Sequence, residues 1–127
     1  MHAKPGNGSP RCADTSVWVQ HFRRGLPTLA DRLSDGLVPM HPFVSGEPAC
    51  GNLKTGAAVL SSLHALPAAK LASSTEVLQL IERRRLWGRG LGWIDIHLLA
   101  SALLSHCELW TLDKKPAEVA AEPGLSR

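Results

Sequence analysis

The spacing of apolar residues predicts a series of helices separated by short strands. In SVWVQHFRRG, residues 16–25, apolar and aromatic side chains recur at helical spacing and a glycine ends the segment. A second short helix is predicted over residues 26–36, and EVLQLIERRRLW, residues 76–87, predicts another that Ser74 or Thr75 can cap. Further helices are expected over residues 42–53, 56–65, 93–106 and 114–122.

Short strands are expected between these helices. ELWTL, residues 108–112, is rich in residues that favour strands. Weaker candidates are residues 12–13, residues 37–40, which Pro39 makes short or irregular, and residues 70–72. Strands that alternate with helices pair in parallel through right-handed crossovers, so the expected fold class is α/β, with helices layered on a sheet.

GLGWIDIHLLASALL, residues 90–104, is an apolar helix that carries one carboxylate. Asp95 lies near the start of this helix, where a carboxylate stabilises the helix dipole by a few tenths to about one kcal/mol. That stabilising role and a role in a functional site both remain open from this segment alone. The apolar face is expected to contain Ile94, Leu98, Leu99 and Leu103.

Three other acids occupy comparable places along the chain. Asp14 directly follows the first predicted strand, Asp113 directly follows the last, and Glu47 lies early in the helix after the second. Ligands of open parallel sheets bind beyond the carboxyl ends of the strands, so these acids and Asp95 are expected to meet at one edge. Taken one at a time, each is equally well explained as a helix cap or a partner of a helix dipole.

Four carboxylates that meet at one edge require neutralisation. Two of them about 5 Å apart repel each other by roughly 3 kcal/mol at an effective dielectric constant near 20. Oxygen ligands without histidine or cysteine favour Mg²⁺ or Mn²⁺. Such an ion ionises a water molecule and stabilises charge on a phosphate. The sequence therefore predicts metal-dependent hydrolysis of phosphodiesters.

Length and composition indicate the number of domains, the kind of partner and the cellular setting that are compatible with this hypothesis. The chain of 127 residues suits one domain, expected over residues 11–127, behind a flexible N-terminal arm of residues 1–10. The net charge of +3 permits a polyanionic partner, and no apolar run is long enough to span a membrane. Three widely spaced cysteines favour a reduced, cytoplasmic setting in which they are buried as small apolar residues, namely Cys12, Cys50 and Cys107.

Four motifs, D-T-S-V-W, G-E, G-W-I-D-x-H-L-L-A and T-x-D-K, occur in this order between Arg11 and Leu125. Together they resemble the PIN-domain endoribonuclease toxins of the VapC family. The resemblance implies a three-layer α/β/α PIN-like domain with a short parallel sheet, an RNA substrate, a cognate antitoxin that covers the site, and a homodimer. It implies a site for Mg²⁺ (or Mn²⁺) formed by Asp14, Glu47, Asp95 and Asp113, with hydroxyls of Thr15 or Ser16 and of Thr111 orienting the carboxylates.

A basic run precedes the helix that carries Asp95. In RRRLWGRG, residues 83–90, arginines surround Trp87. Arginines track phosphates, and an exposed tryptophan stacks on a base with about 1–3 kcal/mol, so this run is expected to contact RNA. The alternative is a solvated helix end with Trp87 packed in the core. The candidate RNA-binding residues are Arg83, Arg84, Arg85, Trp87 and Arg89.

Some features depart from the family pattern. The first strand is weak, and Pro48 directly follows Glu47, where a proline inside a helix costs about 3 kcal/mol. Pro116 restricts the first turn of the last helix. These features leave two alternatives to an active enzyme: a catalytically impaired PIN domain that only binds RNA or its antitoxin, and an unrelated α/β domain whose acids cap helices.

Overall fold

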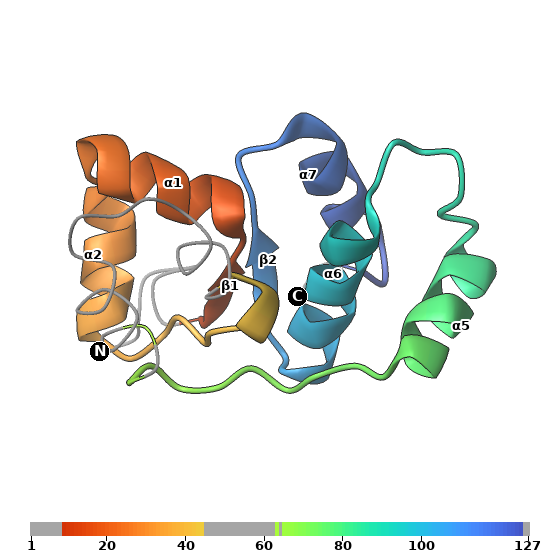
Figure 1. The fold of residues 1–127 in the computed structure, drawn as a ribbon, viewed down its shortest axis with the longest axis horizontal. Helices are drawn as coiled ribbons and strands as arrows, with labels where there is room; N and C mark the ends of the chain where they lie inside the picture. Colours follow the sequence, from red (N-terminus) through yellow and green to blue (C-terminus); the bar gives the residue numbers. More distant parts are fainter. Residues whose placement is uncertain (1–8, 45–62, 64, 126–127) are drawn as a thin grey trace.

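The computed structural model describes residues 9–44, 63 and 65–125, and Figure 1 shows how its elements are arranged. Helices predominate in this part of the chain, and a short sheet joins its two ends. In chain order the elements are β1 (Arg11–Ala13), α1 (Thr15–Arg24), α2 (Pro27–Ser34), α5 (Ser74–Arg84), α6 (Trp93–Leu104), β2 (Glu108–Trp110) and α7 (Lys114–Ala120).

The sheet pairs the two ends of the chain in parallel. Cys12 of β1 lies opposite Leu109 of β2, and the residues on either side pair in the same register. On the other side of β1, the N–H of Arg11 donates to the carbonyl of Leu37 (2.9 Å). This combination of helices with a short parallel sheet confirms the predicted pairing and is compatible with the α/β class.

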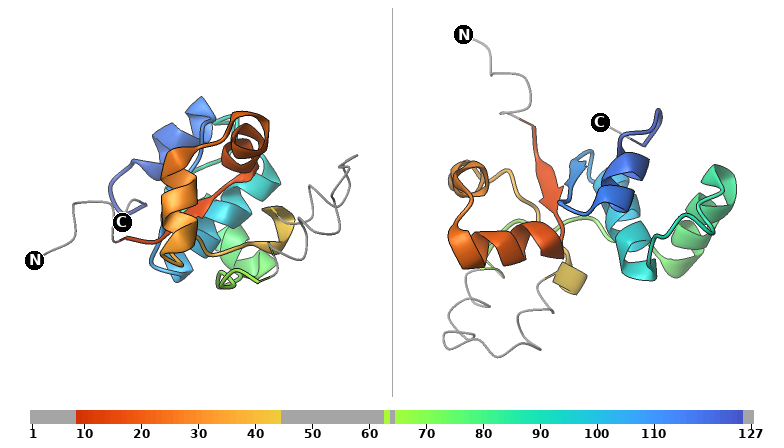
Figure 2. Two further views of the ribbon diagram at one scale, coloured as in Figure 1. Left: turned by 90° about the vertical axis from the view of Figure 1, so that its left-hand side faces the viewer. Right: turned by 90° about the horizontal axis from the view of Figure 1, so that it is seen from above.

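Helix α6 is the central element of the structure. It packs against both strands, and α5 lies on its far side from the sheet (Figures 1 and 2). All residues from Ile96 to Ala102 are buried, so α6 has apolar contacts on both sides. Leu98 belongs to a first core with residues of β1, α1 and α2, and Leu99 belongs to a second core with residues of α5 and α7.

The apolar face predicted for α6 was partly wrong. Leu98 and Leu99 are buried, but Ile94 is 43% exposed because it lies in the first turn of α6, and burial in this helix begins only at Ile96. Helix α5 begins with Ser73 as its N-cap, not with Ser74 or Thr75. Ser73 Oγ accepts the N–H of Glu76 (3.1 Å), whose carboxylate accepts the N–H of Ser73 (2.9 Å), and this reciprocal pair fixes the helix start.

The strand predicted over residues 70–72 is absent. The N–H of Lys70 donates to the hydroxyl of Ser105 (2.8 Å), and its carbonyl accepts the hydroxyl of Ser101. Serine side chains at α6 therefore bind the backbone groups that a neighbouring strand would otherwise bind. In residues 37–40 only Met40 forms a bridge, to Ala68. Residues 42–44 and 63 are helical as predicted, residue 65 is a turn, and the rest of the helices expected over residues 42–53 and 56–65 lies outside the described residues.

The remaining elements match their predictions with ends shifted by a few residues. Helix α6 ends at Leu104 instead of residue 106, and β2 ends at Trp110 instead of residue 112. Cys12 and Cys107 are buried as predicted, and burial raises the pKa of the Cys12 thiol to about 12, whereas Cys50 lies outside the described residues. Across the described ranges, no helix combines the length and apolarity needed to cross a bilayer.

Candidate functional site

Asp14 is held in place by the start of helix α1. It is the N-cap residue and is only 4% exposed. Its Oδ1 atom accepts the backbone N–H groups of Ser16 (3.0 Å) and Val17 (3.3 Å) and the hydroxyl of Ser16 (2.5 Å). No residue that the structure describes donates a hydrogen bond to Oδ2. The helix therefore fixes one oxygen of this buried carboxylate and leaves the other for a ligand.

The Ser16 hydroxyl connects the ends of the two strands. Its oxygen accepts the backbone N–H of Leu112 (2.9 Å) and lies 3.4 Å from Oγ1 of Thr111. Thr111 Oγ1 in turn accepts the backbone N–H of Asp113 (3.1 Å). The chain after β2 is thus tied to the hydroxyl that binds the first acid. The neighbouring hydroxyl of Thr15 makes no hydrogen bond within the described ranges.

Asp113 occupies the N-cap of α7, but its carboxylate makes no capping hydrogen bond. A capping aspartate normally accepts the N–H of the second or third residue of the helix. The third residue of α7 is Pro116, which has no N–H to donate. The second residue, Lys115, has an N–H, but Asp113 does not accept it and its side chain is exposed, so the helix leaves the Asp113 carboxylate available for another partner.

Asp95 is half-buried in the first turn of α6. Its Oδ2 atom accepts the backbone N–H of Gly92 (2.9 Å), which is the helix-capping role considered from the sequence. That role engages one oxygen, and no donor within the described residues binds Oδ1. Capping and participation in a site are therefore compatible for this residue.

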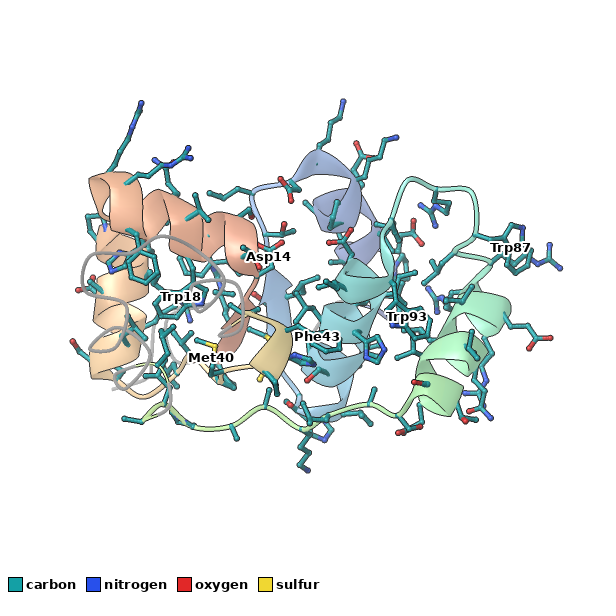
Figure 3. All side chains as sticks on the ribbon, in the orientation of Figure 1. Asp14, Trp18, Met40, Phe43, Trp87 and Trp93 are labelled. Carbon is teal, nitrogen blue, oxygen red and sulfur yellow. The ribbon has the colours of Figure 1, made fainter. Side chains whose placement is uncertain are left out.

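The parallel sheet brings these acids toward one edge. Asp14 and Asp113 follow the carboxyl ends of β1 and β2, and Figure 1 shows α6 running opposite to the strands, with its first turn toward those ends. Figure 3 shows Asp14 at the start of α1, beside β2. Glu47 lies outside the described residues. Within residues 9–44, 63 and 65–125, no three His, Cys, Asp or Glu side chains lie close enough together to hold a metal ion.

The basic run lies at the end of α5, beyond α6 from the sheet (Figure 3). Trp87 is 60% exposed, so the alternative in which it packs in the core is wrong. Two arginines make contacts within the chain: Arg84 donates to the carbonyl of Pro123, and Arg89 forms an ion pair with Glu122. The other two, Arg83 and Arg85, are exposed.

Four aromatic side chains that the sequence analysis did not single out form a row across α6. The His97 ring lies between two of them, with its centroid 5.1 Å from that of Phe43 and 4.7 Å from that of Trp93. His41 follows, 4.9 Å from Phe43. The available signal was the spacing of four residues between Trp93 and His97, on one helix face. We call His41, Phe43, His97 and Trp93 the aromatic row.

His41 makes the stability of the fold depend on pH. It is 3% exposed, and its Nδ1 atom accepts the N–H of Phe43 (3.0 Å). Burial, together with the nearby His97, lowers the pKa of His41 below 6.5. The unfolded chain therefore binds a proton at a higher pH than the folded chain, and the free energy of unfolding falls as the pH drops below about 6.5.

We expect His41→Asn, which retains an acceptor for Phe43, to flatten this dependence by at most about 1.4 kcal/mol per pH unit. Urea unfolding at a series of pH values between 7.5 and 5.5 measures it. His106→Asn is the matched control, because His106 is exposed and its positive φ of 55° suits asparagine. Identical pH profiles for the wild type and His41→Asn would contradict the assignment.

The chain is similar over most of its length to a known ribonuclease. The chain is 43% identical over 114 residues to Ribonuclease VapC32 of Mycobacterium tuberculosis, in both strain CDC 1551 / Oshkosh and strain ATCC 25618 / H37Rv. The alignment covers 89% of this chain and 92% of the relative. No protein-family model matches the chain, and no solved structure matches it significantly.

Proposed function

Because the chain belongs to the VapC family, as its identity to a VapC ribonuclease over most of its length establishes, we propose that it is a metal-dependent endoribonuclease. In this proposal it is the toxin of a toxin–antitoxin pair and cleaves RNA phosphodiesters at a site formed by four carboxylates. The domain has the three-layer α/β/α PIN-like arrangement and acts as a homodimer. The four acids are Asp14, Glu47, Asp95 and Asp113.

The arrangement of Asp14 carries this proposal. A nearly buried carboxylate is stabilised when it is paired or binds a cation, and here one oxygen is fixed by three hydrogen bonds while the other has no donor among the described residues. Asp113 adds a second carboxylate that its own helix does not engage. Both provide hard oxygen ligands, which fit Mg²⁺ or Mn²⁺.

In the proposed reaction these residues hold the metal ion and orient the water that attacks the phosphate. When bound, Mg²⁺ or Mn²⁺ supplies a positive charge that activates water and stabilises charge developing on the phosphate. Asp14 and Asp113, at the ends of the two strands, and Asp95, in α6, would hold this ion after moving closer together, because no three such side chains of the described residues lie close enough to share one. Glu47 would bind the ion or orient the attacking water. The Ser16 and Thr111 hydroxyls fix the chain around the first and last acids.

The RNA substrate extends beyond this site in the proposal. Exposed Arg83, Arg85 and Trp87 offer positive charge and an aromatic ring to a nucleotide chain. Arg84 and Arg89 would contribute through the intramolecular contacts that hold the end of α5. An antitoxin would inhibit the enzyme by covering the acids.

We expect Ser16→Ala to lower RNA cleavage by about 10- to 100-fold, the usual effect of removing a group that orients a metal ligand. The variant leaves Asp14 with two backbone donors but removes the hydroxyl that links it to the chain after β2. Cleavage of total cellular RNA across a Mg²⁺ titration measures the change, and the Mg²⁺ concentration for half-maximal activity should rise.

Ser34→Ala on α2 is the matched control, because among the described residues the Ser34 hydroxyl binds only the carbonyl of Ala30 on its own helix. Its activity and Mg²⁺ dependence should equal those of the wild type. A larger loss with Thr15→Ala than with Ser16→Ala would assign the positioning hydroxyl to Thr15 and overturn this prediction.

A further inference from the structure

The aromatic row combines exposed rings with rigid support. Phe43 is 39% exposed and Trp93 is 44% exposed, although both are large apolar side chains. The His97 ring between them is 7% exposed and meets their planes at 71° and 75°. Because an approximately perpendicular ring covers at most one face of its neighbour, this packing holds both exposed rings and leaves ring surface uncovered.

The support of Phe43 comes from a second buried ring. Its backbone N–H donates to Nδ1 of His41, and the two rings meet at a centroid distance of 4.9 Å. Phe43 is thus in contact with both His41 and His97. Rings that are ordered before binding lose little conformational entropy when a ligand stacks on them.

The position of the row relates it to the proposed site. Trp93 and His97 lie four residues apart on one face of α6, whereas Asp95, two residues after Trp93, projects from the other side of the same turn. A nucleotide chain that crosses the start of α6 would therefore meet Asp95 on one side of the helix and, on the other, the aromatic row, of which Figure 3 labels Phe43 and Trp93.

We propose that Phe43 and Trp93 form a stacking site for unpaired bases of single-stranded RNA, in addition to the proposed cleavage site. The inference rests on the proposed ribonuclease function, because that function brings RNA to the start of α6. Any nucleic-acid base can stack on a flat aromatic ring, so such rings bind RNA without sequence preference. A single stacked base contributes about 1–3 kcal/mol. His41 and His97 are positioning residues, since they act through the two exposed rings.

The test measures binding separately from cleavage. We expect Phe43→Ala and Trp93→Ala each to weaken binding of a short fluorescein-labelled oligoadenylate by about 5- to 150-fold, with EDTA present to prevent cleavage. Fluorescence anisotropy measures the dissociation constants, and Trp93→Phe should restore most of the affinity. With an abasic oligomer of the same length, the wild type and both alanine variants should bind equally, because no base is available to stack.

Ile94→Ala is the matched control. Ile94 adjoins Trp93 and is 43% exposed, but it has no aromatic ring, so its variant should bind oligoadenylate like the wild type. An equal loss in Ile94→Ala and Trp93→Ala would indicate a general apolar surface and overturn the proposal. A change of oligomeric state in both variants, measured by analytical ultracentrifugation, would assign the patch to a protein interface instead.

The two proposals fail in different ways. If the wild type binds oligoadenylate through these rings but cleaves no RNA with Mg²⁺, the stacking site stands and the ribonuclease proposal fails. If the wild type cleaves RNA while Phe43→Ala and Trp93→Ala keep its KM and its affinity for oligoadenylate, the ribonuclease proposal stands and the stacking site is wrong.

Discussion

Replacing Asp95 with asparagine is expected to lower RNA cleavage by at least about 100-fold, beyond the 10- to 100-fold typical of groups that only orient ligands. Asparagine retains an oxygen that accepts the N–H of Gly92, so the start of α6 should survive. It lacks the negative charge that a carboxylate offers to a divalent cation. Cleavage of total cellular RNA with Mg²⁺, and its loss with EDTA, measures the effect.

Asp31→Asn is the matched control, because Asp31 is an exposed acid on α2, away from the ends of the strands. It should cleave RNA like the wild type. Equal cleavage by the wild type and Asp95→Asn would show that Asp95 only caps its helix. A wild type that binds RNA but does not cleave it would favour the catalytically impaired domain considered from the sequence.

Replacing Leu98 with alanine is expected to destabilise the fold by about 2–5 kcal/mol. Leu98 is 2% exposed and joins α6 to the first core, which includes Ala13, Val17 and Trp18. The substitution leaves a cavity between α6 and the elements that position Asp14. Since small domains are stable by only about 5–15 kcal/mol, the melting temperature should fall by many degrees. Urea unfolding monitored by circular dichroism gives the free energy directly.

Leu104→Ala provides the comparison on the same helix. Leu104 is 36% exposed, so its truncation removes less buried surface and should cost well under half as much. Equal losses for the two variants would mean that Leu98 is not a central core residue and would contradict the described packing.

The local sequence pattern was sufficient to predict the helices, because their backbone hydrogen bonds form within the helix itself. Helices α1, α2 and α6 have apolar residues at helical spacing, and their positions were predicted within a few residues. Parallel pairing was also predicted, although Arg11–Ala13 has little strand propensity, because alternation of strands and helices implies a parallel partner. Which strand would lie beside β1 was not predicted.

Contacts between segments that are distant in the sequence could not be predicted from the local sequence pattern. Residues 70–72 are apolar enough for a strand, but the hydroxyls of Ser101 and Ser105 take the backbone groups of Lys70. The burial of Ile94 was overpredicted for a related reason, because helical spacing does not reveal which turns of a helix other segments cover.

The candidate site also contains features that the sequence could predict and features that it could not. The strand ends explain why Asp14 and Asp113 approach one edge, and their order along the chain was enough to predict it. The choice of Ser16 over Thr15 was not predictable, because it depends on how Leu112 approaches α1 after β2. The row formed by Phe43, His97 and Trp93 joins two segments that share no sequence motif.

The pairing of the first strand with the last one makes the timing of synthesis important. The N–H of Asp14 binds the carbonyl of Trp110, so the setting of the first acid depends on residues near the end of the chain. During translation the nascent polypeptide can form α1, α2 and α5 while β1 still lacks its partner. A chain that ends before Glu108 would therefore have an incomplete site. For a ribonuclease toxin, this arrangement would delay activity until β2 has been synthesised.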